Sequence, residues 1–397
     1  MFYSLLTFLF SGLSILVLFP CLVLLGECLA AILPLKPRIE GTRPERIAVL
    51  IPAHNEAQVI ERTLDSIAPQ LQPTDTLIVV ADNCTDATAD LARSKGAKVL
   101  ERFDTQARGK GHALAYGVRS LFSINPDIVV FMDADCDLSP GSLEQLAIQA
   151  LATGKPVQGK YLMEYPSEPG IKDLISGFAF LVKNWVRPLG LANLGNPCLL
   201  TGTGMAFPWS ILQNAPLASD NLVEDMQLGI DLAIAGHSPQ FCVDAEITGR
   251  LPQQIDNATT QRTRWEHGHL KTLSTQVPRL LQASWQQRRF DLLVLAAEVG
   301  IPPLSFLVLL WGGMTFLAVI AIILQIVGIL PLVLLLTAGL ALLVSVLTAW
   351  AGFARSRLPL SSLLMIPLYL LWKIPLYLAF IWRPQTEWIR TDREKES

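Results

Sequence analysis

Apolar and polar positions divide the chain into two apolar ends and a mixed centre. Residues 2–33 are almost continuously apolar, and residues 291–382 are again dominated by apolar side chains. Between them, short apolar runs alternate with segments in which apolar residues recur every three or four positions. This pattern predicts a globular domain between membrane-associated ends. The expected parts are a transmembrane helix in 1–35, a globular domain in 46–290, a membrane region in 291–382 and a tail in 383–397.

The first apolar segment is long enough to cross a bilayer, which requires about 20 residues. It has neither the basic start nor the short apolar core of a cleavable signal peptide. Glu27 is its one charged residue, and Pro20 would kink it. Basic residues follow it at Lys36, Arg38, Arg43 and Arg46. Since basic flanks stay on the cytosolic side of membranes, the globular domain is expected in the cytosol.

The second apolar region contains two segments of spanning length, Leu304–Leu330 and Pro331–Phe353, separated by a turn with Gly and Pro. Asp291–Pro303 is apolar but short, which favours an interfacial position. Ser361–Trp382 has enough length to span, but the basic tail would then lie outside the cytosol. Two prolines and a lysine interrupt it, so we expect a segment that lies in the interface or re-enters the membrane. The tail is therefore expected in the cytosol.

Strand-like runs alternate with helical patterns in the first half of the central stretch. The predicted strands are Arg46–Pro52, Thr76–Ala81, Ala97–Leu100 and Ile128–Met132, and the predicted helices are Glu56–Ala68, Thr85–Lys95, Gly109–Phe122 and Gly141–Ala152. This alternation predicts an α/β fold with a mostly parallel sheet and helices on both faces. Neither a GxGxxG turn nor a Walker P-loop follows a strand, so dinucleotide and P-loop folds are not expected.

The second half of the central stretch has a mixed pattern. Val157–Met163 is predicted as a strand, and Leu199–Phe207 contains a turn of small residues. The predicted helices are Ile171–Val186, Leu222–Ala235 and Asp256–Leu273.

Acidic residues stand where the predicted strands end. Asp133 and Asp135 follow the apolar run Ile128–Phe131, and Asp82 follows the run Thr76–Ala81. Ligands of open α/β sheets bind at the carboxyl ends of the strands. Two carboxylates one residue apart repel each other unless a cation lies between them, and hard oxygen ligands suit Mg²⁺ or Mn²⁺ bridging to a diphosphate. The alternative is a solvated acidic turn, because such short motifs also arise by chance.

Composition narrows the classes of function. The 397 residues are 51% hydrophobic and 16% charged, and the net charge of -3 gives no reason to expect nucleic acid as a partner. The six cysteines form no CxxC pair, which argues against a zinc site or a disulfide framework and fits a reducing compartment.

Other segments carry candidate binding groups, each with a structural alternative. Lys110 lies between two glycines at a predicted helix start, where a phosphate or merely a flexible turn would fit. Small residues at Thr201–Gly204 would let a ligand approach the backbone. Asp86 is either a ligand or a helix-start residue. Trp265 lies beside two arginines and either contacts a ligand or stacks on an arginine. The histidines His54, His237, His267 and His269 are expected to be structural.

Four of these features occur in the order found in membrane-integrated family-2 glycosyltransferases of the GT-A fold. They are the strand end Pro52–Glu56 with Asp82, the pair Asp133 and Asp135, the pair Glu224 and Asp225, and the segment Gln261–Trp265. The chain therefore resembles cellulose, hyaluronan and exopolysaccharide synthases and ceramide glucosyltransferase. The tail segment Trp388–Arg393 resembles, more loosely, a gating loop of some synthases. Val223 stands where the family usually has threonine.

The resemblance implies roles for these residues. It implies Asp225, with Glu224, as catalytic base, and Asp133 and Asp135 as ligands of Mg²⁺ or Mn²⁺. It implies donor binding by these two aspartates and by His54, Glu56, Asp82, Lys110, Gln261 and Arg264. It implies acceptor binding by Trp265, Gly202, Thr203 and Gly204.

The implied reaction is transfer of a sugar from a UDP-sugar, with inversion at the anomeric carbon. We expect a multi-pass membrane enzyme that extends a polysaccharide, if necessary with export partners, because its membrane part is smaller than that of cellulose synthases. The alternative acceptor is a membrane lipid. A third reading is a non-catalytic assembly or export subunit, against which the complete acidic set argues.

Overall fold

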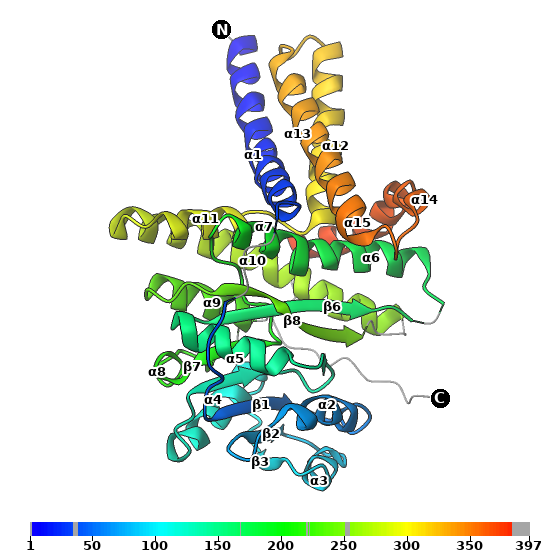
Figure 1. Cartoon of the computed structure of the whole chain (residues 1–397). Coiled ribbons are helices and arrows are strands. Elements are labelled where there is room, and N and C mark those ends of the chain that lie inside the picture. Colours follow the sequence, from blue (N-terminus) through cyan, green and yellow to red (C-terminus); the bar gives the residue numbers. More distant parts are fainter. Residues whose placement is uncertain are drawn as a thin grey trace.

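The computed structural model describes residues 2–34, 39–166, 168–219, 221, 223–250 and 255–382, with the side chains of residues 2, 255–262 and 380–382 outside the description. Its described part is layered (Figure 1). Three long helices project from one side of a group of helices that lie across their base, and the sheet with its helices lies on the other side.

One sheet organises the central domain. Its eight strands have the order β3-β2-β1-β4-β7-β6-β8-β5. Pairs β1–β2, β1–β4, β2–β3 and β6–β8 are parallel, whereas β4–β7, β6–β7 and β5–β8 are antiparallel. The strands are β1 (Ile47–Ala53), β2 (Thr76–Asp82), β3 (Lys98–Arg102), β4 (Ile128–Phe131), β5 (Asp137–Leu138), β6 (Val157–Glu164), β7 (Met205–Pro208) and β8 (Gln240–Arg250).

Helices cover both faces of the sheet because alternate strand residues point to opposite sides. Val49 and Ile51 of β1 pack with α2 (Ile60–Ile67), α3 (Thr88–Ser94) and α5 (Ser142–Thr153). Ala48 and Leu50 pack on the other face with α4 (Lys110–Ser120), α8 (Trp209–Leu212) and α9 (Glu224–Ile234). The predicted mostly parallel α/β sheet is therefore confirmed.

Several boundaries differ from the expectation. Helix α2 begins four residues later than predicted, since Glu56 to Val59 form a turn. The predicted helix Ile171–Val186 is split into α6 (Ile171–Leu181) and a π-helical turn, η3 (Val182–Val186), which leads into α7 (Arg187–Asn193). The strand β8 was not predicted. Helix α10 (Ile255–Gln287) is much longer than the predicted Asp256–Leu273.

Three helices are long and apolar enough to cross a membrane. They are α1 (Phe2–Ala31), α12 (Leu304–Ile323) and α13 (Leu330–Ala349), the last continued by the π-helical turn η4 (Trp350–Ala354). Helices α11 (Phe290–Val299), α14 (Leu360–Leu363) and α15 (Ile366–Trp382) are shorter and lie near the base of the three long helices (Figure 1). The interfacial position expected for these segments stays a prediction.

A buried ionic cluster joins α1 to the central domain. Arg187 Nε donates to Glu27 Oε2 at 2.9 Å, and Arg187 Nη2 lies 2.7 Å from Glu298 Oε2. All three side chains are buried. The backbones of α1 and α7 approach closely, because a Cβ on Gly190 would lie 2.0 Å from the Glu27 carbonyl oxygen. Helix α1 is therefore packed onto the domain.

Candidate functional site

A cavity of about 810 Å³ opens at the carboxyl ends of β1, β2 and β4. Almost all the residues to which we assigned site roles line it, although they come from segments far apart in the chain. The lining residues among them are His54, Glu56, Asp82, Lys110, Asp133, Asp135, Gly202, Glu224, Asp225, Arg264 and Trp265. The fold therefore brings the predicted acidic residues into one cleft. We call the part around Asp133, Asp135, Glu224 and Asp225 the acidic end.

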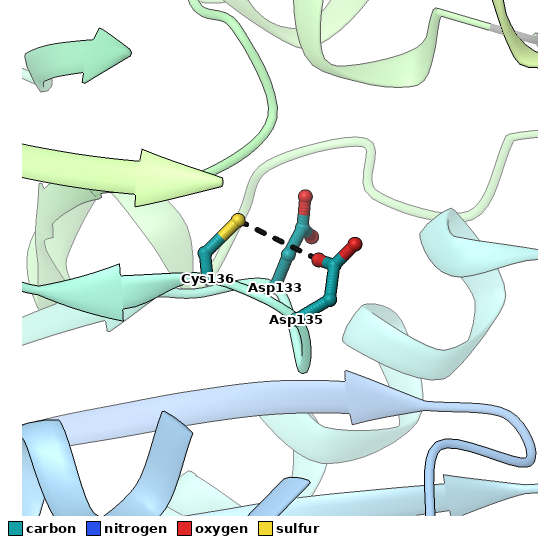
Figure 2. Close-up of side chains that lie close together, drawn as sticks. All are labelled: Asp133, Asp135 and Cys136. Carbon is teal, nitrogen blue, oxygen red and sulfur yellow. Dashed lines mark hydrogen bonds between the residues drawn. The ribbon is translucent and has the colours of Figure 1, made fainter. Parts of the chain in front are cut away.

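The loop after β4 carries the two aspartates (Figure 2). Figure 2 shows both carboxylates projecting to the same side of this loop. The Asp133 backbone N–H donates to Thr203 Oγ1 at 3.0 Å, which fixes the loop against the turn before β7. The Lys110 ammonium forms an ion pair with Asp133 and donates to the Gly202 carbonyl oxygen at 2.8 Å. Lys110 thus joins two segments of the acidic end.

The acidic end holds more negative charge than one lysine neutralises. The pKa of Asp133 is raised by burial and, to a lesser degree, by the neighbouring Asp135, although Lys110 acts to lower it. Burial and the neighbouring Asp225 raise the pKa of Glu224 to about 7. Burial alone would lower the pKa of Lys110, but Asp133 and Glu224 raise it overall. An added cation would stabilise this group of carboxylates.

The chemistry of the ligand atoms fits a hard divalent ion. One ligand atom from each of Asp133, Asp135 and Cys136 lies within 4.8 Å of the others. Burial, with Asp135 and Asp133 nearby, raises the pKa of the Cys136 thiol well above its usual value, so the thiol stays protonated and is a poor ligand. The Cys136 side chain is buried and contacts Tyr161 Oη at 3.7 Å. Two carboxylates remain, as Mg²⁺ or Mn²⁺ prefers.

The strand ends of β1 and β2 form the opposite wall of the cavity. His54 Nδ1–H donates to the Asp82 carbonyl oxygen at 2.6 Å, which fixes the imidazole to the next strand. The Asp82 carboxylate is buried and accepts a hydrogen bond from Arg102 Nη1 at 2.5 Å. Arg102, at the end of β3, was not predicted as a site residue. Its partner Asp82 is therefore held in one orientation beside the cavity.

The turn Thr201–Gly204 lies directly beside Asp225. Gly202 has φ +96°, and a Cβ there would lie 3.2 Å from Asp225 Oδ2 and 3.3 Å from Lys110 Nζ. The positive φ favours glycine here, and any Cβ would make the ends of the Asp225 and Lys110 side chains shift slightly. The buried side chain of Gln158 holds this turn, since its Nε2 donates to the Thr203 carbonyl oxygen at 2.9 Å and its Oε1 accepts from Thr201 N–H at 2.8 Å. Gln158 was missed in the sequence.

Two residues of this turn do not line the cavity. The Thr203 side chain is fully buried and supports the Asp133 loop. Gly204 has φ +64°, and a Cβ there would lie 2.2 Å from Ile247 Cδ1. These positions favour supporting roles, and their predicted contact with an acceptor stays a prediction.

Helix α10 supplies Arg264 and Trp265 to the cavity. Trp265 packs near Phe180 of α6, with ring centroids 6.1 Å apart. The backbone of Gln261 belongs to α10, but its side chain lies outside the described part of the structure, as does the tail segment Trp388–Arg393. His267 Nε2 lies 3.0 Å from the Leu376 carbonyl oxygen, and the buried His269 Nε2 lies 3.3 Å from that of Val299, contacts that favour structural roles for these two histidines.

The contacts of Asp86 favour the role of a helix-start residue over that of a ligand. Its Oδ1 accepts hydrogen bonds from Thr88 N–H at 3.1 Å and from the Thr88 hydroxyl, and its Oδ2 accepts from Ala57 N–H at 3.2 Å. These bonds satisfy the start of α3, and they lower the pKa of Asp86 although burial opposes them.

The far part of the cavity was not predicted. It is lined by Leu24 of α1, Pro303 and Leu304 at the start of α12, and Tyr369 of α15. We call these four residues the apolar end. Two of its helices are among the three that could cross a membrane. The cavity therefore connects the carboxylates of the sheet with the base of the long helices.

A mostly parallel sheet with carboxylates gathered at its strand ends has the architecture of an enzyme that binds a ligand at those ends. Comparison with known families agrees. Residues 44–268 match the family described as "Glycosyltransferase like family 2", and the chain belongs to that family. The predicted family and enzyme class are confirmed.

Curated relatives include several glycosyltransferases. The chain is 28% identical over 239 residues to a probable glycosyltransferase of Bacillus subtilis, which covers 56% of this chain and 55% of that protein. It is 35% identical over 117 residues to 4,4'-diaponeurosporenoate glycosyltransferase of Staphylococcus haemolyticus, covering 28% of this chain and 30% of that one. The matches thus span about half or less of these relatives.

Solved structures share the fold. A mannosyltransferase of Pyrobaculum calidifontis, in complex with GDP-Man and Mn²⁺, superposes with a TM-score of 0.54 over 95% of this chain and 100% of that chain, at 20% identity. The similarity extends over nearly the whole chain, which supports the GT-A fold predicted from the sequence.

Proposed function

We propose that this protein is an inverting, metal-dependent glycosyltransferase that moves a sugar from a UDP-sugar to a lipid acceptor at the cytosolic face of a membrane. The observation that supports this best is the single cavity, because it holds the carboxylates at one end and reaches α1 and α12 at the other. The UDP-sugar and the lipid acceptor could then occupy the same cavity from opposite ends.

The donor would occupy the acidic end. Asp133 and Asp135 would hold Mg²⁺ or Mn²⁺, and the bound ion would supply positive charge that stabilises the departing diphosphate. Lys110 already pairs with Asp133 and would give the diphosphate a second cation. Arg264 and Gln261 of α10 would assist. His54, Glu56 and Asp82 would line the nucleoside pocket beside β1 and β2.

Asp225 would act as the base. A carboxylate near the attacking hydroxyl accepts its proton as the new bond to the anomeric carbon forms. The position of Asp225 beside Gly202 and Lys110 supports this role, since it lies next to the proposed diphosphate site. Glu224 would stay partly protonated near neutral pH and so reduce repulsion against Asp225. Attack from the side opposite the diphosphate would invert the anomeric centre.

The cavity favours the lipid acceptor over the polysaccharide expected from the sequence. Its apolar end is lined by side chains that suit an alkyl chain, and these include Leu24 of α1 and Leu304 of α12. Trp265 would contact the part of the acceptor nearest the sugar. Polysaccharide synthesis, with export partners, stays a prediction and is one outcome of the test.

A donor and product screen tests this function. The protein, reconstituted in vesicles of host membrane lipids with Mn²⁺, is supplied with labelled UDP-sugars and with GDP-mannose. We expect one UDP-sugar to give a labelled product of fixed size that partitions into organic solvent. A product that grows in length would establish polysaccharide synthesis instead, and the absence of transfer from every donor would contradict the proposal.

A further inference from the structure

One half-buried lysine that lines the cavity has no assigned role. Lys183 belongs to the π-helical turn η3, and its side chain lines the cavity. Within the described part of the chain, no hydrogen bond or ion pair joins its ammonium to another residue. The next cation along the chain, Arg187 at the start of α7, is by contrast paired with both Glu27 and Glu298.

The surroundings of Lys183 make an unpaired ammonium costly. Burial lowers its pKa, and the charges that act on it from neighbouring elements are those of Asp225, Arg187, Glu298 and Glu266. A half-buried cation without a partner loses part of its hydration without compensation. Single π-helical turns inside helices occur frequently at functional sites. The position is therefore suited to an anion that enters the cavity.

The location of Lys183 indicates which substrate brings that anion. Lys110, not Lys183, pairs with the aspartates at which we place the diphosphate. Among the charged groups that act on Lys183, Asp225, the proposed base, has the largest effect, and it raises the pKa of the lysine. The apolar end, with Leu24 and Tyr369, lines the same cavity. A head group that reached Asp225 from the long helices would pass Lys183.

We infer that the acceptor is a membrane lipid whose head group carries an anion, phosphate or carboxylate, next to the accepting hydroxyl, and that Lys183 binds this anion. This inference rests on the proposed function and narrows its acceptor class. The hydroxyl oxygen forms a bond to the anomeric carbon while the bond from that carbon to the diphosphate breaks. The nucleoside diphosphate leaves with the bonding electron pair, and the hydroxyl proton passes to Asp225.

Lys183 is then a residue that determines acceptor specificity, and its loss should affect one substrate only. A hydrogen bond between an ammonium and an anionic group is typically strong enough that its removal weakens binding about tenfold or more. Lys183→Met should therefore raise the KM for the lipid about tenfold or more and change the KM for the donor less than about twofold.

The test uses the full chain in phosphatidylcholine vesicles that contain either the acidic or the neutral lipid fraction of the expression host, separated by anion exchange. With a labelled donor and Mn²⁺, we expect the label to enter lipid only with the acidic fraction. Phosphate analysis of the purified product distinguishes a phosphate from a carboxylate. Lys183→Arg should restore the lipid KM in part, and Lys172→Met, which removes an exposed cation of α6, should leave it unchanged.

The outcomes separate the two proposals. Label in the neutral fraction, or an unchanged lipid KM in a folded Lys183→Met variant, would overturn the role of Lys183 and leave the lipid acceptor intact. Release of nucleoside diphosphate without label in either fraction would overturn the lipid acceptor itself. If Lys183→Met fails to fold, two other measurements test the role of Lys183. They are the lipid fraction that the wild-type protein labels and the KM of Lys183→Arg for the lipid.

Discussion

The two ends of the cavity use charge in opposite ways. At the acidic end, the carboxylates of Asp133, Asp135 and Asp225 line the cavity, and Lys110 forms an ion pair with Asp133. Around the apolar end, charged groups pair with one another inside the packing. Arg187 lies between Glu27 and Glu298, and Lys373 of α15 pairs with Glu266 of α10.

The comparison indicates two roles for charged side chains in this molecule. The carboxylates of the acidic end are placed to bind a ligand, whereas the paired charges hold helices together. Carboxylates that face a cavity without enough cations remain ready for a divalent ion and a diphosphate. Paired charges join α1 to α7 and α10 to α15, and they add specificity to the contacts of the long helices with the domain. Lys183 differs from Arg187 and Glu266, which line the same cavity, because those two are paired and no ion pair joins Lys183 to another described residue.

The largest expected effect of a substitution is at Asp225. Asp225→Asn removes the proposed base and should reduce kcat about a thousandfold. Binding of UDP should change little, because the Asp133 loop is untouched. Steady-state rates measure the loss, and Asp244→Asn, at an exposed position of β8, is the control and should retain full turnover. Full turnover by Asp225→Asn would show that Asp225 is not the base and that the acidic end does not carry the chemistry.

The paired charges should affect stability instead. Arg187→Met leaves Glu27 and Glu298 buried without a cation and should lower the free energy of unfolding by about 3 kcal/mol. Denaturant unfolding in detergent measures this change. Arg93→Met removes exposed ion pairs with Asp90 and Glu101 and should lower the free energy of unfolding far less than Arg187→Met does. Equal effects of the two substitutions would show that the buried cluster has no special role in assembly.

Glu224 should make the stability of the acidic end depend on pH. Burial, and then Asp225, raise its pKa from 4.5 to about 7. Between these pH values the folded protein holds a proton that the unfolded chain releases, so this contribution is complete below pH 4.5 and is lost as the pH rises towards 7. Thermal unfolding of Glu224→Gln without divalent ions should depend less on pH than that of the wild type. An identical dependence would contradict the raised pKa.

The smallest expected effect concerns an acidic residue next to the cavity that does not serve it. Asp86→Ala removes acceptors of the Thr88 and Ala57 N–H groups and should lower the free energy of unfolding by about 1 kcal/mol. Its kcat should stay within about twofold of the wild type, because transition-state contacts are unchanged. A large loss of turnover with unchanged stability would instead assign Asp86 to the acidic end.

The pattern of apolar residues along the chain was sufficient to predict the strands that are continuous apolar runs. β1, β2 and β4 are buried on both faces, and their acidic ends follow directly from the chain order. β8 was missed because Asp244, Glu246 and Arg250 interrupt its apolar residues. It is a long strand whose register with β6 shifts after Gly159, so no simple alternation marks it.

The apolar end could not be predicted because no local pattern encodes it. Leu24, Pro303 and Tyr369 come from three separate helices, and each resembles an ordinary residue of an apolar segment. The supporting residues Gln158 and Arg102 were missed for a similar reason, since their partners are defined only by strand pairing. Lys183 gave no indication in the sequence, because the π-helical turn that contains it has the composition of an amphipathic helix.

The most direct test of the central claim is Mn²⁺ binding in the presence of UDP, measured as free Mn²⁺ by electron paramagnetic resonance. The account predicts that UDP creates tight Mn²⁺ binding in the wild-type protein and that substitution of both Asp133 and Asp135 by asparagine abolishes it. Tight, UDP-dependent binding that persists in the double variant would place the metal and the diphosphate elsewhere and contradict the account.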